Sequence, residues 1–213
     1  VWHLVEAMPD LTVGAIVHGQ VDWSRRFDHM KQHSGQHVLS AAFAQLYAAR
    51  TVGFHLGERA STIDLDRPLS PEQVVASESA ANAVVWDDRM VTVRLVSAEE
   101  AARLELRKPS SRTGRIRLVE IERCDLSACG GTHVERTGAI GIIAVSSTER
   151  FKGGTRVGFV CGERALRHVC VQREQVAGCV RLLSVTPEKL GSEIERIQIG
   201  QRDQRRTIRA LQS

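Results

Sequence analysis

The chain has 213 residues, of which 42% are apolar and 25% are charged, a composition typical of a globular protein with a sizeable buried core. No apolar run approaches the roughly 20 residues that a membrane-spanning helix requires, so we expect no membrane span. The net charge of +4 is unevenly distributed: residues 150–213 carry 13 Lys and Arg against 6 Asp and Glu, which favours either a polyanionic partner or a solvated, arginine-rich helix face.

The N-terminal part begins with short alternating stretches and continues into a long helix. Val1–Glu6 and Val13–Trp23 are predicted strands, and we interpret residues 1–24 as the remnant of a small β-barrel. Apolar residues at steps of three and four predict a helix over Asp28–Ala49. Gly53–Asp66 is predicted to form a glycine-bounded turn that leads into a strand. Because the chain starts with Val rather than Met, we expect a piece of a longer protein.

Two capping boxes mark helix starts in the central part. In Ser70-Pro71-Glu72-Gln73 a serine cap precedes a proline at the first helical position, and this helix is predicted to run to Trp86. Ser97-Ala98-Glu99-Glu100 opens a second, short helix. Strands are predicted at Met90–Val96 and Arg115–Glu122. The mixture of predicted helices and strands indicates a fold that contains both α-helices and β-sheet.

The C-terminal part is predicted to contain a hairpin and two helices. The hairpin strands are Ile140–Glu149 and Thr155–Cys161, joined by a turn at Lys152-Gly153-Gly154. Glu163–Leu183 is a predicted helix, and residues 185–213 are predicted to be a helix that links to a further domain beyond the chain. Heptad spacing favours packing of this last helix on a partner, and we expect a homodimer formed through the region beyond the chain. The heptad positions are Leu190, Ile194, Ile197, Gln201, Gln204, Ile208 and Leu211.

Two short motifs contain candidate metal ligands. His33 and His37 are four residues apart in a predicted helix, so their imidazoles lie on one face and can bind one ion. Cys129 and His133 are also four residues apart, and the glycines between them allow a tight turn that directs both side chains inward. Three nitrogens and one sulfur suit tetrahedral Zn²⁺. Five cysteines, an odd number in a chain large enough to fold without disulfides, favour reduced thiols and a cytoplasmic location.

Each motif has a simpler interpretation when it is taken alone. A histidine pair on a helix is often exposed or hydrogen-bonded without any metal, and Cys-Gly-Gly-Thr-His is also compatible with a turn around a buried cysteine. The presence of both motifs in one chain favours a metal site. Four protein ligands are typical of structural zinc. By contrast, Cys129 follows His37 by 92 residues, and the residues around the ligands are small, which favours a site open to a substrate.

The two motifs together resemble the editing domain of alanyl-tRNA synthetases and of the free-standing, AlaX-like alanyl-tRNA editing proteins, which has a relative in threonyl-tRNA synthetases. The resemblance implies an α+β fold with zinc in a cleft between a helix and an antiparallel sheet, within an editing domain over residues 25–184. It also implies that His33, His37, Cys129 and His133 are the zinc ligands and the catalytic residues. The surrounding segments that share the resemblance are Arg26–Phe43, Gly53–Gly57, Ser61–Asp64 and Lys152–Val157.

The resemblance also implies a reaction, which is hydrolysis of the ester that joins Ser or Gly to the terminal ribose of alanine tRNA. We therefore expect a zinc-dependent deacylase that acts in trans on tRNA. Two alternatives are an editing-domain fragment of a full alanyl-tRNA synthetase and a non-catalytic RNA-binding module stabilised by zinc. The expected substrate-binding residues are Gln36, His55, Thr62, Thr132 and Arg156.

Overall fold

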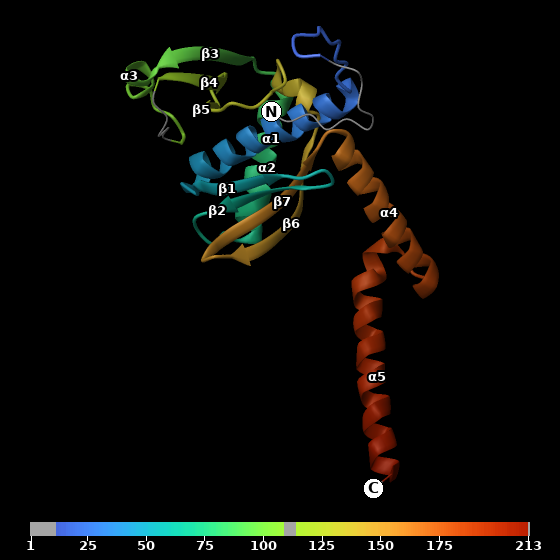
Figure 1. The fold of residues 1–213 in the computed structure, drawn as a ribbon. Coiled ribbons are helices and arrows are strands. Elements are labelled where there is room, and N and C mark those ends of the chain that lie inside the picture. Colours follow the sequence, from blue (N-terminus) through green and yellow to red (C-terminus); the bar gives the residue numbers. More distant parts are fainter. Residues whose placement is uncertain (1–11, 109–113, 213) are drawn as a thin grey trace.

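The computed structural model describes residues 12–108 and 114–212 and shows an α+β fold with two antiparallel sheets (Figure 1). The four-stranded sheet has the order β1-β2-β7-β6, and the three-stranded sheet has the order β3-β4-β5. The strands are β1 (Thr51–Leu56), β2 (Ser61–Leu65), β3 (Val91–Ser97), β4 (Arg115–Ile121), β5 (Asp125–Ala128), β6 (Ile143–Phe151) and β7 (Gly154–Cys161). The helices are α1 (Trp23–Tyr47), α2 (Pro71–Trp86), α3 (Ala98–Ala101), α4 (Glu163–Leu183) and α5 (Leu190–Gln212), with short 3-10 helices η1 (Thr137–Ile140) and η2 (Pro187–Lys189).

Helix α1 runs between the two sheets, and α2 packs against it (Figure 1). Gln32 and every residue from Ser34 to Phe43 are buried, so this part of the helix is enclosed on all sides. A surface helix would bury one stripe only. The enclosure carries the predicted ligand His37 into the interior and leaves His33 half-buried.

The main hydrophobic core joins α1 and α2 to one face of the four-stranded sheet. Leu39 and Phe43 of α1 are fully buried there with Ile63 of β2 and Phe159 of β7. Successive strand residues point to opposite faces of a sheet. Because Ile63 points into the core, its neighbour Thr62 belongs to the face that is turned away from α1.

Two carboxamide side chains attach the helices to the end of the β6–β7 pair. Gln32 of α1 donates to the Cys161 carbonyl at 3.1 Å and accepts from the Cys161 N–H at 2.9 Å. Asn82 of α2 makes the same two bonds with Ile143, at 2.8 and 2.9 Å. Ile143 and Cys161 are paired residues of β6 and β7. Both helices are therefore fixed to one point of the sheet by buried hydrogen bonds, which are costly to leave unmade.

The start of α1 differs from the prediction. The strand predicted at Val13–Trp23 is absent, because residues 12–22 form no strand and Trp23 is the first residue of α1. The Asp22 side chain caps the helix by accepting a backbone hydrogen bond at 3.1 Å, so the helix starts before the predicted Asp28. A good capping residue therefore outweighs the alternating apolar pattern at this position.

The strand predicted at Val1–Glu6 lies outside the described residues, so the β-barrel remnant over residues 1–24 stays a prediction. The turn predicted from Gly53 is wrong, since β1 occupies that stretch and pairs with β2. Strand β5 was not predicted because four residues are too few to show an alternating pattern. The hairpin β6–β7 and helices α2 and α4 lie where the sequence predicted them.

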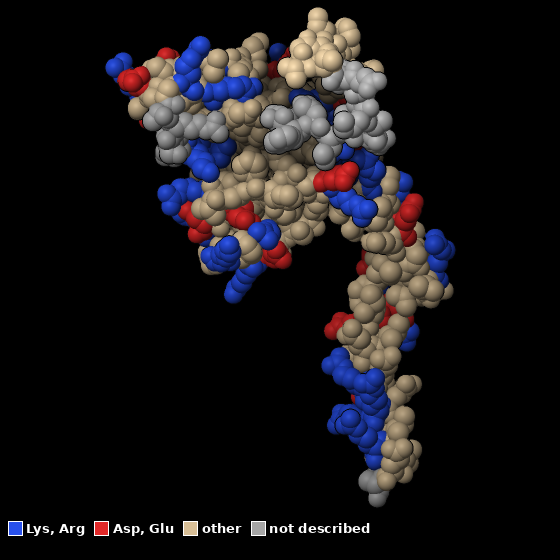
Figure 2. Space-filling view, in the orientation of Figure 1, with Lys and Arg blue, Asp and Glu red and all other residues tan. Residues whose placement is uncertain are grey.

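The C-terminal helix α5 extends away from the body of the protein (Figure 1), and it has no buried residue. Arg side chains lie along one side of its lower part, and uncharged residues lie along the other (Figure 2). Within residues 12–108 and 114–212, none of the helices is long and apolar enough to cross a membrane. The helix predicted for this segment is confirmed, whereas its role as a link to a dimerising domain stays a prediction.

The carboxamide of Gln32 is open to a direct test. Gln32→Leu removes both partners of the buried Cys161 backbone groups, and an unpaired buried polar group costs about 1–3 kcal/mol. We expect the free energy of unfolding, measured by urea denaturation, to fall by at least that amount. The control is Gln45→Leu on the same helix, where an exposed side chain makes one bond to Cys124. Equal stability of the two variants would contradict the assigned role of Gln32.

Candidate metal centre

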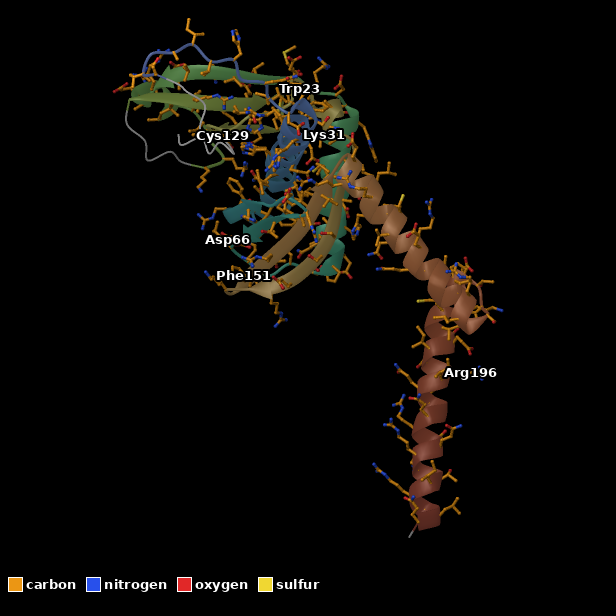
Figure 3. All side chains as sticks on the ribbon, turned by 45° about the vertical axis from the view of Figure 1, so that its right-hand side comes forward. Trp23, Lys31, Asp66, Cys129, Phe151 and Arg196 are labelled. Atoms are coloured by element: carbon orange, nitrogen blue, oxygen red, sulfur yellow. The ribbon has the colours of Figure 1, made fainter. Side chains whose placement is uncertain are left out.

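The four predicted ligands come together beside the middle of α1. His33 and His37 lie one turn apart on the helix, and Cys129 and His133 lie on the loop that follows β5. One ligand atom from each of the four residues lies within 4.8 Å of all the others. Figure 3 shows Cys129 beside α1, far from Phe151 at the tip of the four-stranded sheet and from Arg196 on α5. The sequence prediction of a converging set is therefore confirmed as an arrangement of side chains.

The cysteine sulfur lies between imidazole nitrogens. Cys129 Sγ is 3.4 Å from Nε2 of His33 and 3.4 Å from Nε2 of His133, and it accepts the Gly131 N–H. Burial opposes ionisation of this thiol, but hydrogen bonds from the three histidines outweigh it and lower the Cys129 pKa to about 3. A thiolate beside three imidazoles is a donor set that suits Zn²⁺. The residues present therefore fit a zinc ion.

Two of the imidazoles are oriented by residues behind them. His37 Nδ1 is 2.7 Å from the Asp125 carboxylate, and His133 Nδ1 is 3.2 Å from the Ser34 hydroxyl. In each ring the opposite nitrogen, Nε2, is left for the cluster. Burial disfavours a charged His37, but the hydrogen bonds and charges of Asp125 and Cys129 together outweigh this effect and raise the His37 pKa. Histidines that bind metals are commonly held in this way by a carboxylate or hydroxyl group.

The ligand loop is held in shape by glycine and arginine. A Cβ atom on Gly131 would lie 2.1 Å from His33 Cε1, so the loop can approach the imidazole only without a side chain there. Arg117 Nη1 donates to the carbonyls of Cys129 and Gly131 at 2.7 and 2.8 Å. Gly130 faces open space and has no such constraint. Of the two adjacent glycines, therefore, Gly131 is the one that the site requires.

A cleft of about 390 Å³ opens against this cluster. His33, His37 and Cys129 form part of its wall, so the cluster is not sealed inside the core. The cleft lies between α1 and β1 on one side and the three-stranded sheet with its flanking segments on the other. Its other lining residues include Gln36, Thr51, Phe54, Arg107, Lys108 and Arg117. The cleft thus combines predicted metal ligands, an exposed aromatic ring and three cationic side chains, of which Arg107 is paired with Asp125.

The predicted substrate-binding residues separate into two groups. Gln36 lines the cleft and donates to the Ser40 hydroxyl at 2.8 Å, whereas Thr132 is exposed next to the ligand His133 and lies outside the cleft lining. The second group lies on the outer face of the four-stranded sheet. His55 pairs with Thr62, which points away from α1.

Arg156 lies on the same outer face. It pairs in register with Asp64, and its guanidinium binds that carboxylate at 2.6 and 3.0 Å. It also lies 3.5 Å from the centre of the Phe151 ring. The structure therefore does not bring His55, Thr62 or Arg156 to the cleft.

Sequence reasoning missed several residues that shape the site. Asp125, Ser34 and Arg107 make contacts to ligands or to each other, and Phe54 and Thr51 line the cleft. None of them belongs to a recognisable metal-binding spacing. The nearest signal was the position of Asp125 four residues before Cys129, but polar residues at such spacing are common in any sequence.

The two adjacent glycines provide a matched pair of variants. In Gly131→Ala the added methyl group collides with the His33 ring and must displace it, and we expect zinc affinity to fall at least about 10-fold, as for other disturbed ligand shells. Gly130→Ala should bind zinc like the wild type, because its methyl group meets no atom within 4 Å. Competition with a chromophoric chelator measures both affinities. A Gly131→Ala variant that bound zinc normally would show that the loop is not held as described.

The low pKa of Cys129 predicts an unusual pH dependence of alkylation. In folded, metal-free protein, a pKa of about 3 keeps Cys129 ionised from pH 8 down to about 5, so its rate with iodoacetamide should stay nearly constant over this range. The fully buried Cys161, whose pKa is raised by burial, should not react. Mass spectrometry of the labelled peptides measures alkylation at both cysteines, and added zinc should protect Cys129 from alkylation. A rate for Cys129 that falls tenfold per pH unit below pH 8 would contradict the assignment.

Comparison with known proteins identifies relatives along nearly the whole chain. Residues 116–157 match the threonyl and alanyl tRNA synthetase second additional domain. The chain is 35% identical to alanine–tRNA ligase of Pyrococcus furiosus over 98% of its own length and 24% of the ligase. It is 34% identical to alanyl-tRNA editing protein Aarsd1-B of Xenopus laevis, over 99% of the chain and 50% of that protein. It is 39% identical to alanyl-tRNA editing protein Aarsd1 of Bos taurus, over 74% of the chain and 36% of that protein.

These matches agree with the motifs and with the geometry of the centre. The chain spans half the length or less of each of these three relatives. The matched domain includes β4, β5 and the loop that carries Cys129 and His133. The chain is thus a relative of the alanyl-tRNA synthetase editing-domain family, which includes the free-standing alanyl-tRNA editing proteins.

Proposed function

We propose that this chain is a zinc-dependent hydrolase that removes Ser or Gly from mischarged alanine tRNA, acting in trans. The observation that carries the proposal is that the cluster of three imidazoles and one thiolate forms part of the wall of an open cleft. The names of the relatives, alanyl-tRNA editing protein and alanine–tRNA ligase, supply the substrate class. Because the substrate is used in translation, the proposal includes a cytoplasmic location.

The residues of the cleft have distinct proposed tasks. His33, His37, Cys129 and His133 would hold zinc. When bound, the ion would stabilise negative charge that develops at the ester. Alternatively, it would hold the amino group of the attached amino acid or a nearby water molecule. The chain itself provides Lys108 and Arg117 in the cleft wall, and their positive charges favour the phosphates of an RNA end, whereas the charge of Arg107 is paired with Asp125.

The predicted substrate contacts are assigned by their positions. Gln36 lies in the cleft wall with its carboxamide fixed by Ser40, so it is a proposed partner for a polar group of the attached amino acid. Thr132 is proposed to contact the RNA beside the ligand loop. His55, Thr62 and Arg156 face away from the cleft, so any contact that they make with tRNA would involve a part distant from the ester.

Two alternatives predict different behaviour of the same preparation. Four protein ligands are typical of structural zinc, which favours a non-catalytic module that binds RNA. The match to a quarter of an alanine–tRNA ligase favours an editing fragment that works in cis within a larger enzyme. The first alternative predicts zinc and RNA binding without hydrolysis. The second predicts that hydrolysis becomes efficient only in the longer protein.

The proposal is tested by measuring hydrolysis of alanine tRNA that carries serine. We expect one zinc per chain and multiple turnovers, and we expect His37→Ala to lower the rate at least about 100-fold, the size of effect seen when a stabilising group is removed from an active site. His29→Ala is the control, since this histidine lies on the same helix outside the cluster. Measurement combines elemental analysis with release of labelled serine. Full activity of a folded, zinc-free His37→Ala variant would overturn the proposal.

A further inference from the structure

A buried carboxylate lies directly behind the metal centre. The Asp125 side chain is fully buried, and its Oδ2 atom is 2.7 Å from His37 Nδ1. Arg107 donates to it twice, from Nε to Oδ1 at 2.6 Å and from Nη2 to Oδ2 at 3.2 Å. The Ser127 hydroxyl lies 3.0 Å from both carboxylate oxygens. A carboxylate held by three groups in this way has little freedom to turn.

The backbone explains why these residues meet. Asp125 and Ser127 are two residues apart on β5, so their side chains point to the same face of the three-stranded sheet. The Arg107 N–H donates to the Leu126 carbonyl at 2.9 Å, which attaches the arginine to the same strand. The ligand loop begins immediately after β5, at Cys129. The short strand β5 therefore positions two parts of the centre. It carries Asp125, which contacts His37, and it leads directly into Cys129.

Arg107 affects the hydrogen bond between Asp125 and His37, because it binds the same carboxylate. Its guanidinium balances the carboxylate charge, so the bond to His37 does not depend on a positive charge on the imidazole. Asp125 can then accept the Nδ1–H of a neutral ring, and the lone pair of that ring lies on Nε2. A metal ligand requires this neutral tautomer with a free Nε2. The contacts thus turn Nδ1 of His37 toward Asp125 and leave Nε2 directed at the cluster.

We propose that Asp125, held by Arg107 and Ser127, is a positioning residue that presents Nε2 of His37 to the metal. This inference rests on the zinc centre proposed above and adds a role for three residues outside the ligand motifs. Arg107 also lines the cleft. The chain Arg107–Asp125–His37 therefore connects the wall that faces the substrate with a metal ligand.

The test compares two aspartates, each of which binds two nitrogens of one arginine. Asp125→Asn leaves one acceptor oxygen where there were two, so either Arg107 or His37 loses its partner. We expect zinc affinity, measured by chelator competition, to fall about 10- to 100-fold. The control is Asp28→Asn on α1, because Asp28 binds Arg164 at 2.9 and 2.6 Å and does not contact the cluster. It should keep the wild-type affinity.

A second measurement separates positioning from a loss of stability. Cobalt substituted for zinc reports the ligand geometry through its visible absorption, and we expect Asp125→Asn to change this spectrum while Asp28→Asn leaves it unchanged. If Asp125→Asn does not fold, Ser127→Ala decides the question, because it removes one hydrogen bond to the same carboxylate. A reduced affinity of the folded Ser127→Ala variant supports the inference, and an unchanged affinity overturns it.

The outcomes also distinguish this inference from the proposal on which it rests. Wild-type protein that binds no zinc would overturn the metal centre itself. Wild-type protein that binds zinc, together with a folded Asp125→Asn variant of unchanged affinity and unchanged cobalt spectrum, would overturn only the positioning role of Asp125.

Discussion

The burial of a polar helix between two sheets is the constraint on which the rest of this structure depends. The central part of α1 contains glutamines, serines and histidines where a core helix would ordinarily be apolar. Buried polar groups destabilise a protein unless they have partners. Gln32 finds them in the backbone of Cys161, Ser34 in His133 and the Val134 N–H, and His37 in Asp125. Of these contacts, those of Ser34 and His37 also orient the predicted ligands.

This arrangement accounts for the distribution of ligands along the chain. Two ligands lie on a helix that the sheets enclose, and two lie on a loop that the three-stranded sheet carries to that helix. Neither half forms a site alone, in contrast to compact zinc modules with closely spaced ligands. The consequence is a centre whose geometry depends on tertiary packing, with one side accessible from a cleft. Such a location combines a ligand set arranged by packing with an open cleft.

The sequence predicted the residues that belong to a local spacing pattern, and it did not predict those whose role depends on contacts between distant segments. His33, His37, Cys129 and His133 were predicted because a four-residue spacing has a geometric meaning on a helix and around a glycine turn. Asp125 was not, because its role depends on a strand of four residues and on an arginine that meets it only in the folded chain. Short strands lack a readable period, and contacts between distant segments leave no local pattern.

The same reasoning explains why three of the predicted substrate contacts lie away from the cleft. His55, Thr62 and Arg156 belong to segments that share the family resemblance, but strand alternation places their side chains on the outer face of the sheet. A shift of one residue along a strand decides which face a side chain occupies. Phe54, the immediate neighbour of His55, lines the cleft instead. Motif similarity located the right strands, and only the three-dimensional register assigned the faces.

The central claim is that one thiolate and three imidazoles bind a single zinc ion. X-ray absorption at the zinc edge tests it directly, because sulfur and nitrogen ligands differ in distance. The account predicts one sulfur at about 2.3 Å and three nitrogens at about 2.0–2.1 Å from zinc. A spectrum with no sulfur contribution, or with oxygen ligands in place of the imidazoles, would contradict it.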